Sequence, residues 1–121
     1  MTPIATKSIQ KVPLINQVGL EFVSIHDIIY FESDKNYLWV KLKSGERKYY
    51  FCSLGKVEQL LAQFNCFYRI HHSYIVNINQ VKSYKKGDGG EIILDNEERI
   101  PVSRNKRSGF LKWVFANNGE V

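Results

Sequence analysis

The sequence predicts a small, mainly β domain with two short helices, and its length and composition favour this class. With 121 residues the chain has the size of one ordinary domain, and such a chain hides roughly two-thirds of its unfolded surface on folding. Hydrophobic residues make up 44% and charged residues 24%, a balance typical of globular rather than disordered chains. Aromatic residues reach 13%. Because aromatic side chains fit a half-buried pleated surface, the composition favours strands.

The first half of the chain contains short strand-like runs in close succession. Residues 1–11 are polar and weakly periodic, and we interpret them as a flexible leader or linker remnant ahead of a domain formed by residues 12–121. The first three predicted strands are residues 12–15, 20–25 and 28–33. They are separated by only a few residues, which is typical of antiparallel connections.

The clearest strand covers residues 36–43. Leu38, Val40 and Leu42 alternate there with aromatic and basic residues, and this period of two predicts one face for the core and one for solvent or a ligand. The Ser44-Gly45 pair is expected to close a hairpin into residues 46–51.

Helical spacing appears twice in the second half. Ser53 stands where an N-cap belongs, and behind it apolar residues recur at Leu54, Val57, Leu60, Leu61 and Phe64. Further strands are predicted at residues 67–70, 78–84, 91–94 and 99–102, with turns at the glycine cluster 87–90 and at Asn96. Ser103 is expected to cap a final helix whose apolar stripe is Phe110, Leu111, Val114 and Phe115.

The charge balance favours a polyanionic partner. Lysine and arginine together outnumber aspartate and glutamate 17 to 12, which gives a formal charge of +5, although a merely solubilising surface charge is the alternative. Cys52 and Cys66 form no CxxC motif and follow no signal peptide, so we interpret them as packing thiols of a cytoplasmic protein. No apolar run reaches the roughly 20 residues of a membrane helix.

The start of the last helix carries an unusual concentration of cations. Arg104, Lys106 and Arg107 follow Ser103 directly, where the helix dipole is already positive. An incoming phosphate would reverse this repulsion, because free N–H groups, the serine hydroxyl and the cations would converge on one anion. The alternative is a solvated basic turn.

A second basic and polar segment runs from Arg69 to Ser73 and includes His71 and His72. A metal site is disfavoured, because no further ligand stands at suitable spacing and adjacent side chains usually point apart. One histidine is expected to be structural and the other to face outward beside Ser73. Strand alternation from Arg69 favours His71 as the structural one, but both assignments remain open.

The third segment is the turn from Asp34 to Tyr37, in which the Asn36 amide has the bidentate geometry that reads adenine. The alternative is a plain turn, where asparagine adopts left-handed backbone geometry.

No phosphate-binding glycine loop, GxSxG motif or acid–base carboxylate pair is found in the sequence. We therefore expect no enzyme activity, no catalytic residue, no metal and no cofactor.

These segments, in this order, resemble a known family. Residues 31–42 (FESDKNYLWVKL), 67–81 (FYRIHHSYIVNINQV) and 100–113 (IPVSRNKRSGFLKW) are similar to the LytTR DNA-binding domain of bacterial response regulators of the LytR and AgrA type. The resemblance spans about residues 12–115. It implies an elongated arrangement of small, mostly antiparallel sheets, whose loops enter successive major grooves of duplex DNA.

The resemblance also implies the residues that contact DNA. They are Lys35, Asn36, Tyr37, Arg69, His72, Ser73, Arg104, Lys106 and Arg107. His72 departs from the family, which commonly has arginine or lysine at this position, and a histidine supplies charge only when protonated. Family members usually carry an N-terminal receiver domain, which does not precede Met1, so the chain is interpreted as an excised output domain or a stand-alone regulator.

The predicted function is sequence-specific binding of promoter DNA, with a second copy of the chain on a repeated site. Two alternatives belong to other classes. One is a single-stranded RNA-binding β module in which Tyr37 and Trp39 stack on bases. The other is a protein-interaction module that docks an acidic partner on the basic face.

Overall fold

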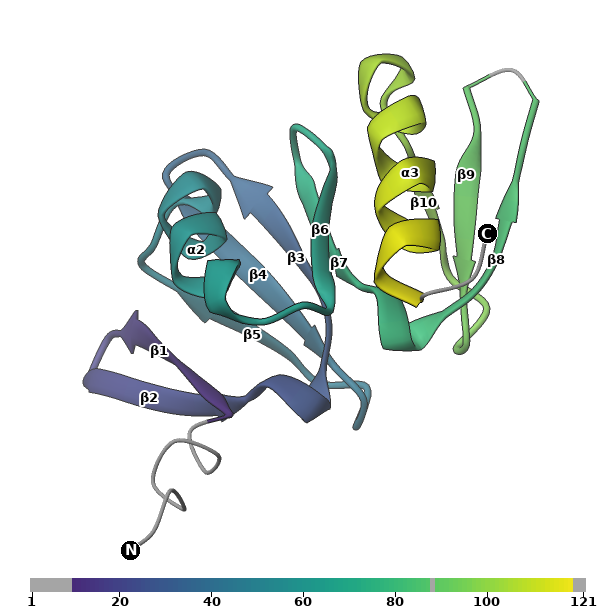
Figure 1. Ribbon diagram of the computed structural model, residues 1–121. Helices are drawn as coiled ribbons and strands as arrows, with labels where there is room; N and C mark the ends of the chain where they lie inside the picture. Colours follow the sequence, from purple (N-terminus) through teal and green to yellow (C-terminus); the bar gives the residue numbers. More distant parts are fainter. Residues whose placement is uncertain (1–9, 88, 119–121) are drawn as a thin grey trace, which may run out of the picture.

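The computed structural model describes residues 10–87 and 89–118, and it confirms a mainly β fold of small antiparallel sheets with two short α-helices (Figure 1). The strands are β1 (Lys11–Asn16), β2 (Gly19–Ser24), β3 (Ile28–Asp34), β4 (Tyr37–Leu42), β5 (Arg47–Tyr50), β6 (Phe67–His71), β7 (Tyr74–Asn77), β8 (Val81–Lys85), β9 (Glu91–Leu94) and β10 (Arg99–Pro101). The helices are α2 (Leu54–Leu60) and α3 (Arg107–Asn118). Within the described residues, no helix is both long and apolar enough to cross a bilayer.

Three sheets follow one another across the molecule in Figure 1. The β1–β2 hairpin forms the first, the strands β5-β4-β3-β7-β6 the second, and β10-β9-β8 the third. Every strand pair is antiparallel. This pattern follows from the short connections in the sequence, since antiparallel neighbours need only a turn between them.

The first core lies between one face of the five-stranded sheet, α2 and the β1–β2 hairpin. Leu38 and Val40 are fully buried there, as their alternation predicts. The Ser53 hydroxyl accepts a hydrogen bond from the Lys56 backbone N–H at 3.2 Å, which confirms the predicted N-cap. A 3-10 turn, Leu61–Gln63, follows α2 directly and extends the predicted apolar spacing.

The second core packs the opposite face of the five-stranded sheet against the three-stranded sheet and α3. Phe110 is buried, but Phe115 is 54% exposed, so its place in the predicted apolar stripe is wrong. At 100° per residue, Phe115 lies about 140° around the helix from Phe110. Trp113 belongs to the apolar stripe of α3 in place of Phe115. It follows Phe110 by three residues, and its ring centroid lies 4.9 Å from that of Tyr68.

The structure corrects the predicted strand 78–84. Residues Ile78–Gln80 form a 3-10 turn, and the strand β8 begins only at Val81. The cause is Asn77, whose side-chain oxygen accepts a hydrogen bond from the Asn79 N–H at 3.0 Å and starts the turn.

The expectation that Ser103 caps the last helix through its side chain is also wrong. Ser103 precedes a 3-10 turn, Arg104–Lys106, and its hydroxyl makes no capping hydrogen bond. Its backbone carbonyl instead accepts from the Lys106 N–H at 2.9 Å, and α3 follows from Arg107. The leader predicted at residues 1–11 falls outside the described residues up to residue 9, as does Asp88 within the glycine cluster, while Lys11 begins β1.

Candidate nucleic-acid interface

The three segments singled out in the sequence lie along one edge of the molecule, the upper edge in Figure 1. They are the β3–β4 turn, the β6–β7 turn and the start of the last helix. Two backbone hydrogen bonds between residues far apart in the sequence fix the positions of these segments relative to one another. The Ser33 N–H donates to the Ser73 carbonyl at 2.9 Å, and the Ser103 N–H donates to the Ile70 carbonyl at 2.8 Å. The segments therefore form one composite surface.

The β3–β4 turn exposes Lys35 and Asn36, whose side chains bond to no other described residue. Lys35 has a φ of 60°, so it, and not Asn36, adopts the left-handed conformation considered for a plain turn. Tyr37 is 44% exposed, and its ring packs at 5.5 Å from that of Phe51. The turn is thus fixed at its base while its two central side chains face outward for a ligand.

Arg69 braces the β6–β7 turn from inside the protein. Its guanidinium donates from Nη1 to Glu58 on α2 at 2.9 Å and from Nη2 to the His72 carbonyl at 2.6 Å. The side chain is only 24% exposed. The geometry makes Arg69 a residue that positions the turn, whereas His72 is exposed at its tip.

His71 and His72 stack on each other, with ring centroids 4.4 Å apart and an angle of 29° between the planes. The expectation that adjacent side chains point apart is wrong here, because a register shift between Arg69 and His71 breaks the alternation of β6. His71 is the partly buried member, and its Nδ1 accepts from the Ser73 N–H at 3.1 Å. Burial, and then the neighbouring His72, lower the pKa of His71. His71 is therefore held as a neutral structural acceptor.

The third segment presents Arg104 fully to solvent, while Lys106 and Arg107 are partly buried. The 3-10 turn that they form bends into α3 through a hydrogen bond from the Arg107 N–H to the Arg104 carbonyl. The predicted DNA-contacting residues therefore differ in exposure.

Most cations on this edge have no counterion within the described part of the chain. The edge cations without an ion pair are Lys35, Lys85, Lys86, Arg104, Lys106 and Arg107. Nearby acids are already engaged: Asp34 accepts from the Tyr49 hydroxyl at 3.1 Å, and Glu58 pairs with Arg69. Sequence reasoning missed Lys85 and Lys86, although a lysine pair directly before a glycine cluster was a usable signal.

Trp39 is poorly placed to stack on a base. The Arg47 guanidinium lies 4.5 Å above its ring, and the Tyr49 ring centroid is 4.6 Å away. These contacts already occupy the aromatic surface that a single-stranded RNA binder would need.

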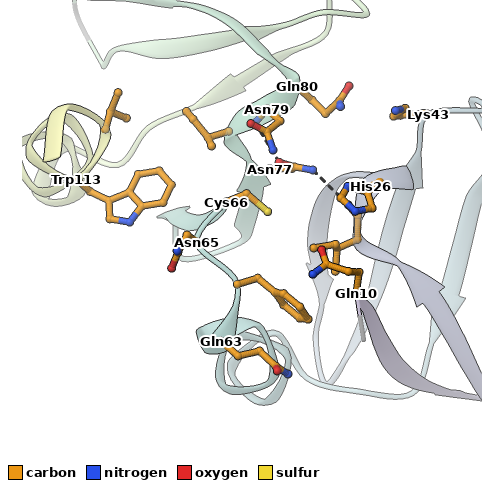
Figure 2. Close-up of a pocket in the computed structure, with 14 residues that line it drawn as sticks. Gln10, His26, Lys43, Gln63, Asn65, Cys66, Asn77, Asn79, Gln80 and Trp113 are labelled. Atoms are coloured by element: carbon orange, nitrogen blue, oxygen red, sulfur yellow. Dashed lines mark hydrogen bonds between the residues drawn. The ribbon is translucent and has the colours of Figure 1, made fainter. Parts of the chain in front are cut away.

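Figure 2 shows a cavity of about 660 Å³. His26 and Gln10 face it from one side, and Cys66, Asn65 and Trp113 from the other. Its lining contains no carboxylate, and burial raises the pKa of the Cys66 thiol, which disfavours a reactive thiolate. In the described ranges, no three histidine, cysteine or acidic side chains cluster as metal ligands would.

Comparison with known proteins gives concordant matches. The family model described as the LytTr DNA-binding domain matches residues 19–114. The CO-responsive transcriptional regulator RcoM of Rhodospirillum rubrum is 33% identical over 101 residues, which cover 79% of this chain and 41% of RcoM. An uncharacterized response regulatory protein of Vibrio cholerae, VC_A0850, is 24% identical over 88 residues, which cover 70% of this chain and 34% of that protein.

A solved structure matches the whole domain. A structure described as the LytTr DNA-binding domain of a putative methyl-accepting/DNA response regulator from Bacillus cereus superposes with a TM-score of 0.73 at 29% identity, and the match covers 87% of this chain and 96% of that one. The chain spans less than half the length of the two curated relatives, so the similarity concerns one domain of each.

Proposed function

The chain belongs to the family of LytTr DNA-binding domains, and we propose that it binds duplex DNA at a specific sequence through the three turns on its upper edge. The observation that carries this proposal is the pair of long-range backbone hydrogen bonds, Ser33 to Ser73 and Ser103 to Ile70, that joins the three turns. A fixed spacing between turns is what reading of successive grooves requires. The domain would serve a bacterial transcriptional regulator that acts on promoter DNA in the cytoplasm.

Base reading is assigned to the two exposed side chains best suited to it. Arg104 offers a planar fork of donors that matches the O6 and N7 acceptors of guanine. Asn36 offers one donor and one acceptor, which matches adenine. Both are exposed and have no side-chain partner among the described residues. Each is therefore free to pair with a base without first breaking an internal bond.

Phosphate contacts are assigned to Lys35, Lys106 and Ser73. Lys35 and Lys106 flank the two base readers in sequence, where they would fix register on the backbone without reading sequence. His72, exposed at the tip of the β6–β7 turn, contributes an imidazole N–H donor. Arg69 acts through the His72 carbonyl, so its role is to hold the turn.

In-vitro selection of duplexes from a random pool tests the proposal directly. The expected result is a short enriched sequence, and two enriched copies about 10 base pairs apart would place two chains on one face of the helix. Binding to the selected duplex should resist a scrambled duplex and a single-stranded RNA competitor. Absence of any enriched sequence, or stronger competition by the RNA, would overturn the proposal.

A further inference from the structure

We propose that the base of the β8–β9 hairpin, together with Arg107 at the start of α3, forms an additional site for a DNA backbone phosphate, beyond the contacts assigned above to the three turns. This inference rests on the proposed function, since it assigns a further contact on the same ligand. The site comprises Tyr84, Lys85, Lys86, Gly90 and Arg107. Of these, only Arg107 belongs to the segments that the sequence singles out.

Arg107 carries a partly enclosed positive charge without a counterion. Its Nε and Nη2 atoms are shielded from solvent and make no hydrogen bond. No ion pair to a described residue compensates them. An enclosed charge without a partner is strongly unfavourable, and native proteins rarely keep one without a function. The guanidinium therefore calls for an anion.

Tyr84 adds a second unsatisfied group at the same place. Its hydroxyl is also enclosed and without a hydrogen-bond partner. Gly90 brings the two groups together: a Cβ at this position would lie 3.0 Å from the Tyr84 Oη and 3.1 Å from the Arg107 Nε. Gly90 has a φ of 67°, which a larger residue adopts only with strain. A small, left-handed residue is thus what allows the backbone to approach both donors.

Lys85 and Lys86 place two more charges at the rim. Together with Gly87, Gly90 and Glu91 they line a cavity of about 260 Å³. Glu91 does not neutralise them, because its carboxylate accepts from Arg99 at 2.6 Å. Both lysines are exposed and unpaired within the described residues. Within residues 10–87 and 89–118, the cavity is therefore a concave surface whose positive charges have no ion pair.

The chemistry of the five residues identifies the ligand class. The two exposed ammonium groups can donate to a phosphate oxygen directly, whereas the enclosed guanidinium and phenol hydroxyl can do so only after their side chains or the hairpin shift on binding. The site lies on the same upper edge as the three turns, because the hairpin end and the start of α3 both reach that edge in Figure 1. A backbone phosphate of the bound duplex is thus the anion within reach.

The salt dependence of binding tests the site. For the chain bearing both Lys85→Ala and Lys86→Ala, log K against log salt on the selected duplex should become shallower by about 1 to 2, because each lost phosphate contact removes about 0.9 from the slope. Lys82→Ala is the matched control, since this lysine lies on the same strand but pairs with Glu97 at 2.6 Å. Its slope should equal that of the unsubstituted chain. An unchanged slope for the double variant overturns the inference.

Tyr84→Phe separates a binding role from a structural one. The substitution removes an enclosed hydroxyl that has no partner, so the melting temperature should stay the same or rise. Affinity for the duplex should nevertheless fall about tenfold to a hundredfold, as expected for one lost hydrogen bond to a charged group. Unchanged affinity would show that Tyr84 does not contact the phosphate. Failure of the unsubstituted chain to bind the duplex would overturn the proposed function. Normal binding by the unsubstituted chain, by the double lysine variant and by Tyr84→Phe would overturn only the additional phosphate site.

Discussion

The two ends of the five-stranded sheet treat their polar groups in opposite ways. At the end beneath the three turns, six cations have no ion pair among the described residues, and Arg107 and Tyr84 have enclosed donors without partners. At the other end, near the cavity of Figure 2, Lys43 also has no ion pair among the described residues, but Asn77, the polar side chain that is buried there, has its hydrogen bonds made. The enclosed polar groups of one end are therefore satisfied within the protein, whereas those of the other end leave donors for a ligand.

Asn77 shows what a structural polar residue looks like in this fold. It is only 2% exposed, and its Nδ2 donates to the carbonyls of Ile28 at 2.9 Å and Ile25 at 3.4 Å. Its Oδ1 accepts from the Asn79 N–H. One side chain thus ties β7 to the turn before β3, about 50 residues away. Substitutions at the two ends should therefore separate stability from binding.

Asn77→Ala is expected to have the largest effect, and on stability. Two carbonyls of buried residues and one N–H would lose their partner, which costs at least about 3 kcal/mol of the free energy of unfolding, since each unsatisfied group costs about 1 to 3 kcal/mol. Urea denaturation measures this loss. Asn79→Ala, at an exposed position whose side chain makes no such bonds, should change the free energy of unfolding by less than about 0.5 kcal/mol. A stable Asn77→Ala protein would remove the basis of the comparison.

Arg104→Ala should show the reverse behaviour. Loss of a bidentate guanine contact costs about 1 to 3 kcal/mol of specific binding free energy, whereas the melting temperature should not change, because the side chain is exposed and unpaired. Gel-shift titrations with the selected duplex and with a scrambled duplex measure the difference. Lys106→Ala is the comparison variant and should weaken both duplexes alike. Equal loss on both duplexes for Arg104→Ala would instead make Arg104 a phosphate contact.

Arg69→Ala tests whether a cation on the binding edge can act by positioning alone. The variant should lose about 1 kcal/mol of unfolding free energy, because the bonds to Glu58 and the His72 carbonyl disappear. DNA affinity should fall as the turn loosens, while the slope of log K against log salt stays constant. A slope shallower by about 0.9 would instead show that Arg69 contacts a phosphate directly. Glu58→Gln, which leaves the bond to His72 in place, should have the smaller effect on affinity.

Sequence reasoning reached the parts of this molecule that local patterns determine. The alternation around Leu38 and Val40 predicts the strand and its buried face, and Ser53 predicts the start of α2, because each signal lies within a few residues of its effect. The three turns were found for the same reason: polar and basic residues interrupt apolar runs there. Their meeting at one edge depends on pairing between distant strands, which no local pattern contains.

Three features that sequence reasoning missed depend on long-range contacts or on small shifts of register. The stacking of His71 on His72 follows from a one-residue irregularity in β6. The 3-10 turn after β7 follows from Asn77, an ordinary residue in a strand-like run until its distant partners are known. The site at Gly90 needs the hairpin and α3 to meet, so the lysine pair alone did not identify it.

His71 provides the finest test, because it sits on the binding edge but is bonded like a structural residue. Its pKa in the folded chain is lowered below the ordinary value of 6.5, mainly by burial. On acidification, the unfolded chain therefore takes up a proton before the folded chain does. The resulting stability is complete above pH 6.5 and is lost as the pH falls through 6.5 toward the folded pKa. The melting temperature should decline over this range, by an amount that corresponds to a fraction of one proton.

His71→Asn isolates this contribution, because an asparagine oxygen can accept the same hydrogen bond from the N–H two residues later but does not titrate. The variant should keep the turn, and its melting temperature should depend less on pH as the pH falls below 6.5, because the lowered pKa of His71 places its titration there. His72→Asn is the matched substitution on the exposed neighbour; because His72 is the smaller of the two causes that lower the pKa of His71, this variant should keep most of the pH dependence of stability. If His72→Asn, and not His71→Asn, reduced the pH dependence of the melting temperature, His72 would be the structural histidine. His71 would then be the member of the pair that is available to a ligand at the β6–β7 turn.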